Sequence, residues 1–300
     1  MAFWRGRVQW MRLQGDAEEG TMAIYVLSDV HGHRVALEEA LEAAAPAADD
    51  AIYVLGDMVD RGPDPLGVMQ LVRSLPNTHV LMGNHERMLV DILLGTGEMD
   101  NFTWALNGGV ATALGLDSLN EDELGELLRW VRALPLYDVV EAAGRNFILV
   151  HAGIDALEAR GFLATAGIDT CDGRGAGDAT REDLLNMLAR QDDETLLWTR
   201  TEFWSRPTGL VGADGTGPVV IAGHTPSIVL ARYMETDDGV GVDAEGRGCV
   251  VPVGACEDTG GVADRVDIDC SAAAGAPRGR VGIMRLDDGA TWYAAIREGE

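Results

Sequence analysis

Five short apolar segments in this chain are each followed by residues that can bind a metal ion. These residues are Asp29-Val30-His31, Gly56-Asp57, Gly83-Asn84-His85-Glu86, His151-Ala152-Gly153 and Gly223-His224-Thr225. Four of the six histidines of the chain lie in these positions. A single histidine after a strand is commonly structural, but five such strand ends are hard to obtain by chance. In open α/β sheets ligands bind at the carboxyl ends of the strands, so we expect these side chains to meet in one site.

The most informative of these ends is the stretch VLGDMVDRG, residues 54–62. The apolar run over residues 51–55 predicts a buried strand, and the glycine after it allows a tight turn. Asp57, Asp60 and Arg61 follow within a few residues. Two carboxylates and a guanidinium are therefore expected at one point beyond the strand. The alternative is a polar turn that caps a core strand, since Gly-Asp is common turn chemistry.

Strand and helix patterns alternate along the chain, which is typical of an α/β fold. Residues 23–27 and 51–55 both read AIYVL, and the pattern between them predicts a helix over residues 34–45 that stops at Pro46. This is a βαβ unit with two neighbouring parallel strands. Further strands are predicted over residues 79–82, 147–150, 219–222, 265–269, 280–286 and 291–296, and further helices over residues 64–75 and 86–94 and after Asn120 and Thr180.

Three segments do not fit this alternation. Residues 1–21 precede the first strand and are predicted to be an N-terminal extension, in which residues 3–13 are compatible with a short interaction helix. Residues 155–178 are rich in Gly and Ala and predict a loop over the site. Residues 236–264 are rich in Gly and acidic residues and predict a surface insertion. We expect residues 22–300 to form a single domain that carries this insertion.

The charge of the chain excludes some classes of partner. There are 23 Lys and Arg against 49 Asp and Glu, a formal net charge of −26. So acidic a surface repels phosphate backbones, which argues against nucleic acid and anionic membranes as partners. No run approaches the ~18 to 20 apolar residues of a membrane span, and no signal peptide is evident. The four Cys include no CxxC pair; we expect reduced thiols in the cytoplasm, the alternative being a bridge between Cys249 and Cys256.

The residue types at the five strand ends suit a pair of metal ions. Carboxylate, imidazole and amide oxygen ligands favour manganese, iron or zinc. One carboxylate that bridges two ions gives the ~3.5–4 Å metal pair that phosphatases use to activate water and to hold phosphate oxygens. His85 adjoins Asn84 and is suited to protonate a leaving group, Asp60 to orient His85, and Arg61 to bind phosphate with its two-pronged guanidinium.

The motifs DVH, GDMVDRG, GNHE, VHAG and GHT, in this order, resemble the calcineurin-like metallophosphoesterase family, and within it the bacterial Ser/Thr phosphoprotein phosphatases. The resemblance extends over roughly residues 22–297 and implies a four-layer αββα sandwich of two mixed sheets. It also implies two divalent ions, with manganese expected and iron or zinc as alternatives. One ion would be held by Asp29, His31 and Asp57, and the other by Asp57, Asn84, His151 and His224.

The same resemblance assigns catalytic roles. His85 and Asp60 would form the acid pair, and Arg61 would bind phosphate. Trp198-Thr199-Arg200 matches a Trp-x-Arg stretch of the family, so Arg200 would be a second phosphate-binding arginine, the alternative being a surface arginine. Asn84 and His85 would also face the phosphate. The sequence departs from the family pattern at Asp269-Cys270-Ser271, where relatives typically carry an Asp-Thr-Gly-like turn. This stretch is expected to line the side of the site that faces the substrate.

Three functions are compatible with these motifs. The first is hydrolysis of phosphoserine and phosphothreonine proteins or of small phosphoesters, by direct attack of metal-bound hydroxide. Thr225-Pro226 after the last histidine, and Trp104 with the NGG that begins at Asn107 and with Thr112, resemble this branch. The second is a symmetrical bis(5'-nucleosyl)-tetraphosphatase, whose branch usually reads GNHD. The third is an inactive binding module, which the intact ligand positions disfavour. The acidic insertion is expected to influence which substrates reach the site; the oligomeric state is left open.

Overall fold

The computed structural model describes residues 22–96, 99–171, 173–234 and 240–300. The predicted N-terminal extension over residues 1–21 lies outside the described residues. The strands form two five-stranded sheets, each of which contains both parallel and antiparallel pairs.

The first sheet has the strand order β10-β9-β1-β2-β3. Its strands are β1 (Ile24–Leu27), β2 (Ala51–Val54), β3 (Thr78–Val80), β9 (Arg280–Arg285) and β10 (Thr291–Ala295). β1 and β2 are parallel neighbours with Ile24 opposite Ala51, as their shared AIYVL sequence predicted. The helices on the outer face are α1 (Arg34–Ala44), α2 (Pro65–Ser74), α3 (Asn84–Leu94), α4 (Asn101–Leu106), α5 (Val110–Leu116) and α6 (Glu121–Arg132).

The second sheet has the strand order β4-β5-β6-β8-β7. Its strands are β4 (Tyr137–Ala142), β5 (Arg145–Val150), β6 (Val219–Ala222), β7 (Val251–Val253) and β8 (Arg265–Asp267). The outer face is covered by α7 (Ala156–Thr165), α8 (Arg181–Leu188), α9 (Asp193–Trp198) and α10 (Thr201–Trp204). Three short 3₁₀ helices, Ser227–Arg232, Glu257–Thr259 and Ala272–Ala274, complete the described elements.

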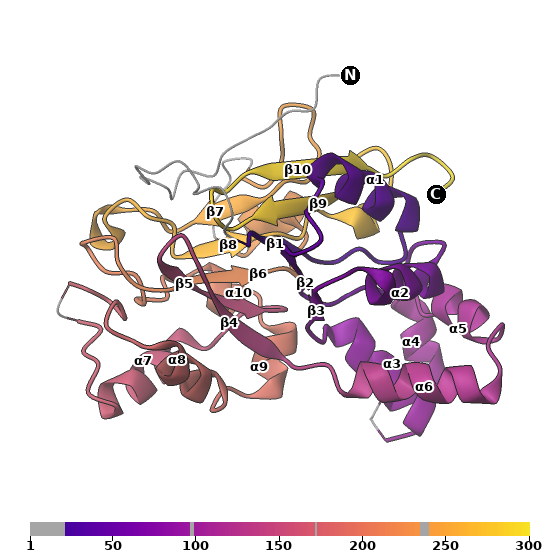
Figure 1. Ribbon diagram of the computed structural model, residues 1–300, viewed down its shortest axis with the longest axis horizontal. Coiled ribbons are helices and arrows are strands. Elements are labelled where there is room, and N and C mark those ends of the chain that lie inside the picture. The colour runs from indigo at the N-terminus through magenta and orange to yellow at the C-terminus, as the bar shows by residue number, and fades with distance from the viewer. Residues whose placement is uncertain (1–21, 97–98, 172, 235–239) are drawn as a thin grey trace.

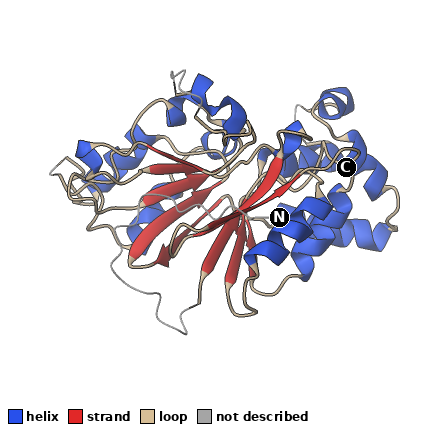
Figure 2. Cartoon of the chain, turned by 90° about the horizontal axis from the view of Figure 1, so that it is seen from above, coloured by secondary structure: helices blue, strands red, loops and turns tan. Residues whose placement is uncertain are grey.

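The two sheets pack face to face and bury a shared apolar layer. Val26, Leu55, Leu149, Ile221 and Val266, which are all almost inaccessible to solvent, belong to this layer. Figure 2 shows the strands of both sheets in the centre and helices on either side. The arrangement is the αββα sandwich of two mixed sheets that the sequence analysis predicted.

Two sequence predictions differ from the structure. Residues 155–178 were expected to be a loop, but residues 156–165 form α7, which Asp155 caps by accepting bonds from the N–H groups of Leu157 and Glu158. Residues 236–264 were expected to form a surface insertion, but residues 251–253 are strand β7 at the edge of the second sheet. Pro252 is tolerated there because an edge strand leaves one N–H side without a partner. None of the described helices is long and apolar enough to cross a membrane.

Candidate metal centre

The carboxyl ends of four strands converge on one point of the molecule. β1 and β2 deliver the loops that contain Asp29 and Asp57, and main-chain bonds of 3.1 Å from Asp29 N to Gly56 O and of 2.9 Å from His31 N to Asp57 O join these two loops. β5 and β6 deliver His151 and His224, and Gly223 N donates to His151 O over 2.7 Å. The parallel pairing within each sheet therefore places all four loops at the same edge.

The backbone of these loops has an uncommon conformation. Ten non-glycine residues in the described chain have a positive φ. Six of them are predicted site residues, with φ between 47° and 69°: Asp29, His31, Asp57, Asp60, Arg61 and His224. An L-residue in this region is strained, and such residues are found where a function over-determines the backbone. The strain thus coincides with the predicted site.

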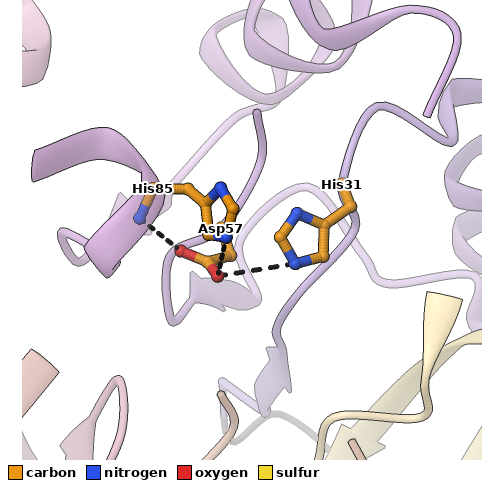
Figure 3. Close-up of side chains that lie close together, drawn as sticks. All are labelled: His31, Asp57 and His85. Atoms are coloured by element: carbon orange, nitrogen blue, oxygen red, sulfur yellow. Dashed lines mark hydrogen bonds and ion pairs between the residues drawn. The ribbon is translucent and has the colours of Figure 1, made fainter. Parts of the chain in front are cut away.

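Asp57 lies between two groups of candidate metal ligands. His31, Asp57 and His85 form one group and Asp57, His151 and His224 the other; in each group the ligand atoms lie within 4.8 Å of one another. Asp57 Oδ2 is 3.5 Å from His31 Nε2, and Asp57 Oδ1 is 3.5 Å from His151 Nε2. Figure 3 shows the carboxylate of Asp57 facing the imidazoles of His31 and His85. A carboxylate shared in this way can bridge two ions.

Two histidines are held in the orientation that a metal ligand requires. His31 Nδ1 lies 2.9 Å from the carbonyl of Val59, and His151 Nδ1 lies 2.8 Å from the carbonyl of Leu55. A carbonyl only accepts, so each Nδ1 carries the proton and each Nε2 turns its lone pair towards Asp57. Burial lowers the pKa of His31 well below its usual value. The neutral imidazole, which is the form that binds metals, is therefore favoured.

Asn84 and Asp29 complete the set of oxygen donors. Asn84 Oδ1 lies 2.8 Å from His151 Nε2 and 3.0 Å from His224 Nδ1. Asp29 Oδ2 accepts from the N–H of His224 over 2.9 Å, whereas Asp29 Oδ1 lies 3.9 Å from His31 Nε2. This second oxygen is buried and has no hydrogen-bond partner in the described part of the chain. Such an oxygen is costly unless a cation neutralises it, so the residues fit a metal site.

His85 lies beside these donors, in a chain of hydrogen bonds of its own. Its Nδ1 is 2.6 Å from Asp60 Oδ2, and its Nε2 is 2.9 Å from Arg61 NH2. A guanidinium only donates, so Nε2 of His85 accepts and Nδ1 donates its proton to Asp60. Burial, and after it the nearby Arg61, lower the pKa of His85 to about 2. His85 is thus a neutral imidazole of one fixed tautomer.

Helices α4 and α5 hold Asp60 and Arg61 in place. Thr112 Oγ1 donates to Asp60 Oδ1 over 2.6 Å, and Trp104 Nε1 donates to Asp60 Oδ2 over 3.1 Å. Arg61 N donates to the carbonyl of Gly108 over 3.0 Å. Burial raises the pKa of Asp60 to about 6, and the bonds from Thr112 and Trp104 oppose that shift by favouring the charged form. The WxxNGGxxT stretch, residues 104–112, therefore has a positioning role that its sequence alone did not reveal.

Glu86 is a structural anchor that the sequence analysis did not assign. Its buried carboxylate accepts from Asp57 N at 2.7 Å, Met58 N at 2.8 Å, Val59 N at 3.3 Å and Gly83 N at 3.0 Å. Burial raises the pKa of this carboxyl, and the N–H donors oppose the rise. Its place directly after Asn84 and His85 in GNHE was the available signal. Glu86 ties the loop after β2 to the start of α3.

Arg200 approaches the site from the second sheet. It donates from NH2 to the carbonyl of His224 over 3.2 Å. Its Nε is buried without a hydrogen-bond partner among the described residues. The structure therefore brings all ten predicted site residues into one cluster, connected through contacts of 3.9 Å or less.

Known proteins resemble part of this chain. Bis(5'-nucleosyl)-tetraphosphatases (symmetrical) of Erwinia tasmaniensis and Psychromonas ingrahamii are 31% and 34% identical to it over 138 and 135 residues, which is 44% of this chain and 45% of each relative. The match thus extends over less than half the length of these relatives. A protein serine/threonine phosphatase of Saccharomyces cerevisiae has the same fold, with a TM-score of 0.54, 13% identity and coverage of 95% of this chain and 83% of that one.

The family profile of calcineurin-like phosphoesterases matches residues 22–249, which include all ten predicted site residues. This family is built on a dinuclear metal centre, in agreement with the two ligand groups that share Asp57. Because the match extends over more than half of the 300 residues, the chain belongs to the calcineurin-like metallophosphoesterases.

Proposed function

We propose that this protein is a dinuclear-metal phosphomonoesterase that hydrolyses phosphoserine and phosphothreonine in proteins, or small phosphoesters. The observation that carries the proposal is the position of Asp57 in both ligand groups. The proposed ligands are Asp29, His31 and Asp57 for one ion and Asp57, Asn84, His151 and His224 for the other. When bound, the two ions would lower the pKa of a water molecule and neutralise phosphate oxygens. Manganese is the ion we propose, with iron or zinc as alternatives, because carboxylate, imidazole and amide donors suit all three.

The remaining site residues would act on the substrate directly. Arg61 and Arg200 would bind the phosphate, beside Asn84 and His85. To protonate the leaving oxygen, His85 Nε2 would first have to take up a proton, such as the one that the attacking water gives up, while Asp60 keeps the other proton on Nδ1 and stabilises the imidazolium. In the structure Arg61 NH2 donates a hydrogen bond to His85 Nε2 over 2.9 Å. We therefore propose that an incoming phosphate draws Arg61 away and so frees His85 for the leaving group.

The charge of the protein supports a phosphoprotein over a nucleotide. A net charge of −26 repels a polyanion such as a dinucleoside tetraphosphate and favours phosphosites flanked by Lys or Arg. We propose that the enzyme acts in the cytoplasm, where reduced thiols are the rule. All four cysteines are free, and Cys249 and Cys256 form no bridge.

A symmetrical bis(5'-nucleosyl)-tetraphosphatase is the second candidate. The relatives from Erwinia tasmaniensis and Psychromonas ingrahamii carry this name, and this observation favours it. Against it, Glu86 stands where that branch usually has Asp.

Hydrolysis of defined substrates by the manganese-loaded protein tests the proposal. The substrates are a phosphothreonine peptide with basic flanks, the same peptide with acidic flanks, and diadenosine tetraphosphate. We expect the highest kcat/KM for the basic peptide, and loss of all turnover in Asp57→Asn. A higher kcat/KM for diadenosine tetraphosphate than for either peptide would establish the second candidate. No turnover of any substrate by protein that holds two ions would refute both.

A further inference from the structure

Helices α4 and α5 each expose two large apolar side chains. Phe102 and Leu106 of α4 are 72% and 73% exposed, Val110 and Leu114 of α5 are 55% and 67% exposed, and within each helix the two residues lie four positions apart and so share a face. They are half of the eight large apolar side chains that are exposed in the described chain. Clustered exposed apolar side chains of this kind mark interaction sites. We call these four residues the outer row.

The outer row belongs to the element that positions the phosphate-binding loop. The same segment carries Trp104 on α4, Gly108 in the turn between the two helices and Thr112 on α5, and these residues contact Asp60 and Arg61. Figure 1 shows α5 at the periphery of the molecule. A ligand on the outer row would therefore bind the same helices that hold Asp60 and Arg61 in place.

The charges around the outer row specify the chemistry of its partner. Residues 88–128 contain eight acidic residues and no Lys, Arg or His. Asp100 precedes the row and Asp117 follows it, and both are exposed. A complementary segment carries apolar side chains for the row and basic side chains for its acidic surroundings, and has no acidic residue.

One segment of this chain has that composition. Residues 3–13, FWRGRVQWMRL, contain six apolar side chains and three arginines, and the first acidic residue of the chain is Asp16. Residues 278–286 also combine three arginines with apolar residues and have no acidic residue, but they include strand β9 of the first sheet. We propose that residues 3–13 dock on the outer row. The eight residues 14–21 between this segment and the first described residue can extend to at most about 29 Å.

Limited trypsin digestion of the full-length protein tests the proposal. Trypsin cleaves after Arg5, Arg7 and Arg12, and mass spectrometry measures the rate at these bonds. Docking protects them, so we expect Phe102→Ser with Leu106→Ser to accelerate their cleavage roughly tenfold, the change that about 1.4 kcal/mol of lost docking energy produces. Leu157→Ser is the matched control, because Leu157 is 80% exposed on α7. It should leave the rates unchanged.

A second pair of substitutions separates docking from a general loss of structure. Trp4→Ser with Trp10→Ser should accelerate cleavage as much as the outer-row pair, and the combination of all four should add nothing, because both pairs remove the same contact. If the arginine bonds of the unmodified protein are protected only at high protein concentration, the segment docks on the outer row of a second copy of the chain. That result would also support the proposal, because the docking surface is the same. The proposal would be overturned if the outer-row pair left the cleavage rates unchanged. It would also be overturned if the effects of the two pairs added in the variant with all four substitutions.

Discussion

Replacement of Glu86 by Gln tests whether this residue anchors the metal-binding loop. The side chain keeps its size, but one carboxylate oxygen becomes an NH2 group. Oε2 accepts from Asp57 N and Gly83 N, and Oε1 accepts from Met58 N and Val59 N. Whichever way the amide turns, two buried N–H donors lose their acceptor and face another donor.

The expected loss of stability follows from these two donors. A buried donor without a partner costs about 1–3 kcal/mol, so Glu86→Gln should lower the free energy of unfolding by about 2–6 kcal/mol. Each of the two pairs of donors includes an N–H group of the loop after β2, either that of Asp57 or that of its neighbour Met58. Displacement of this loop should weaken metal binding by a factor of about 10 to 100, as loss of an outer-shell contact typically does.

Urea unfolding of the metal-free protein and calorimetric titration with manganese measure the two effects. Glu126→Gln is the control, since Glu126 is 67% exposed and its contact with Arg73 is at the surface. It should change stability by less than about 0.5 kcal/mol. A loss below about 1 kcal/mol in Glu86→Gln, together with unchanged metal affinity, would refute the role of Glu86 as an anchor.

Three further changes probe the site. His85→Asn should retain both ions and lose about 10²–10⁴-fold in kcat for a substrate with a poor leaving group; equal kcat values would remove His85 from the mechanism. Thr112→Val deletes a donor to Asp60, so kcat should fall while the metal content, read by mass spectrometry, stays at two; Thr103→Val at the surface of α4 is its control, and equal activity of the two variants would contradict the positioning role. A chelator should lower the melting temperature, because Asp29 and Asp57 lose the cations that neutralise them, and manganese should restore it; a melting temperature insensitive to metal would argue against both ion sites.

Much of the fold was predictable because local signals and packing agree. The apolar runs that end at Leu27, Leu55 and Val150 are buried on both faces, and this is the environment that makes such a run a strand. The helix after Asn120 begins where its capping box indicated, with Asn120 and Glu123 exchanging bonds. The candidate metal ligands and His85 were predictable for a related reason: they lie in loops that follow strands which pattern alone identifies. Asp60 and Arg61 lie further along one of these loops, whereas Arg200 follows helix α9 and was assigned only through the family resemblance.

The missed elements depend on contacts that lie far apart in sequence. α7 contains Gly161 and several alanines, so its sequence lacks a clear apolar face, yet Ala159 and Leu163 are fully buried against the second sheet. β7 is three residues long and contains Pro252, and pairing with β8 alone makes it a strand. The role of Glu86 was hidden for the same reason, because three of its four N–H donors come from residues 57–59.

The positive φ angles at the strand ends bear on how such a protein changes over generations. Each left-handed L-residue costs about 1 kcal/mol or more, and a glycine at the same position would relieve that cost. Selection for the stability of the fold alone would therefore replace Asp29, Asp57 or His224 early. At these positions the substitutions that stabilise the fold most are also those that remove a proposed metal ligand. Stabilised descendants that still work must have gained their stability elsewhere. A homologous sequence with glycine at these positions is then expected to keep the fold and to have lost the catalytic activity.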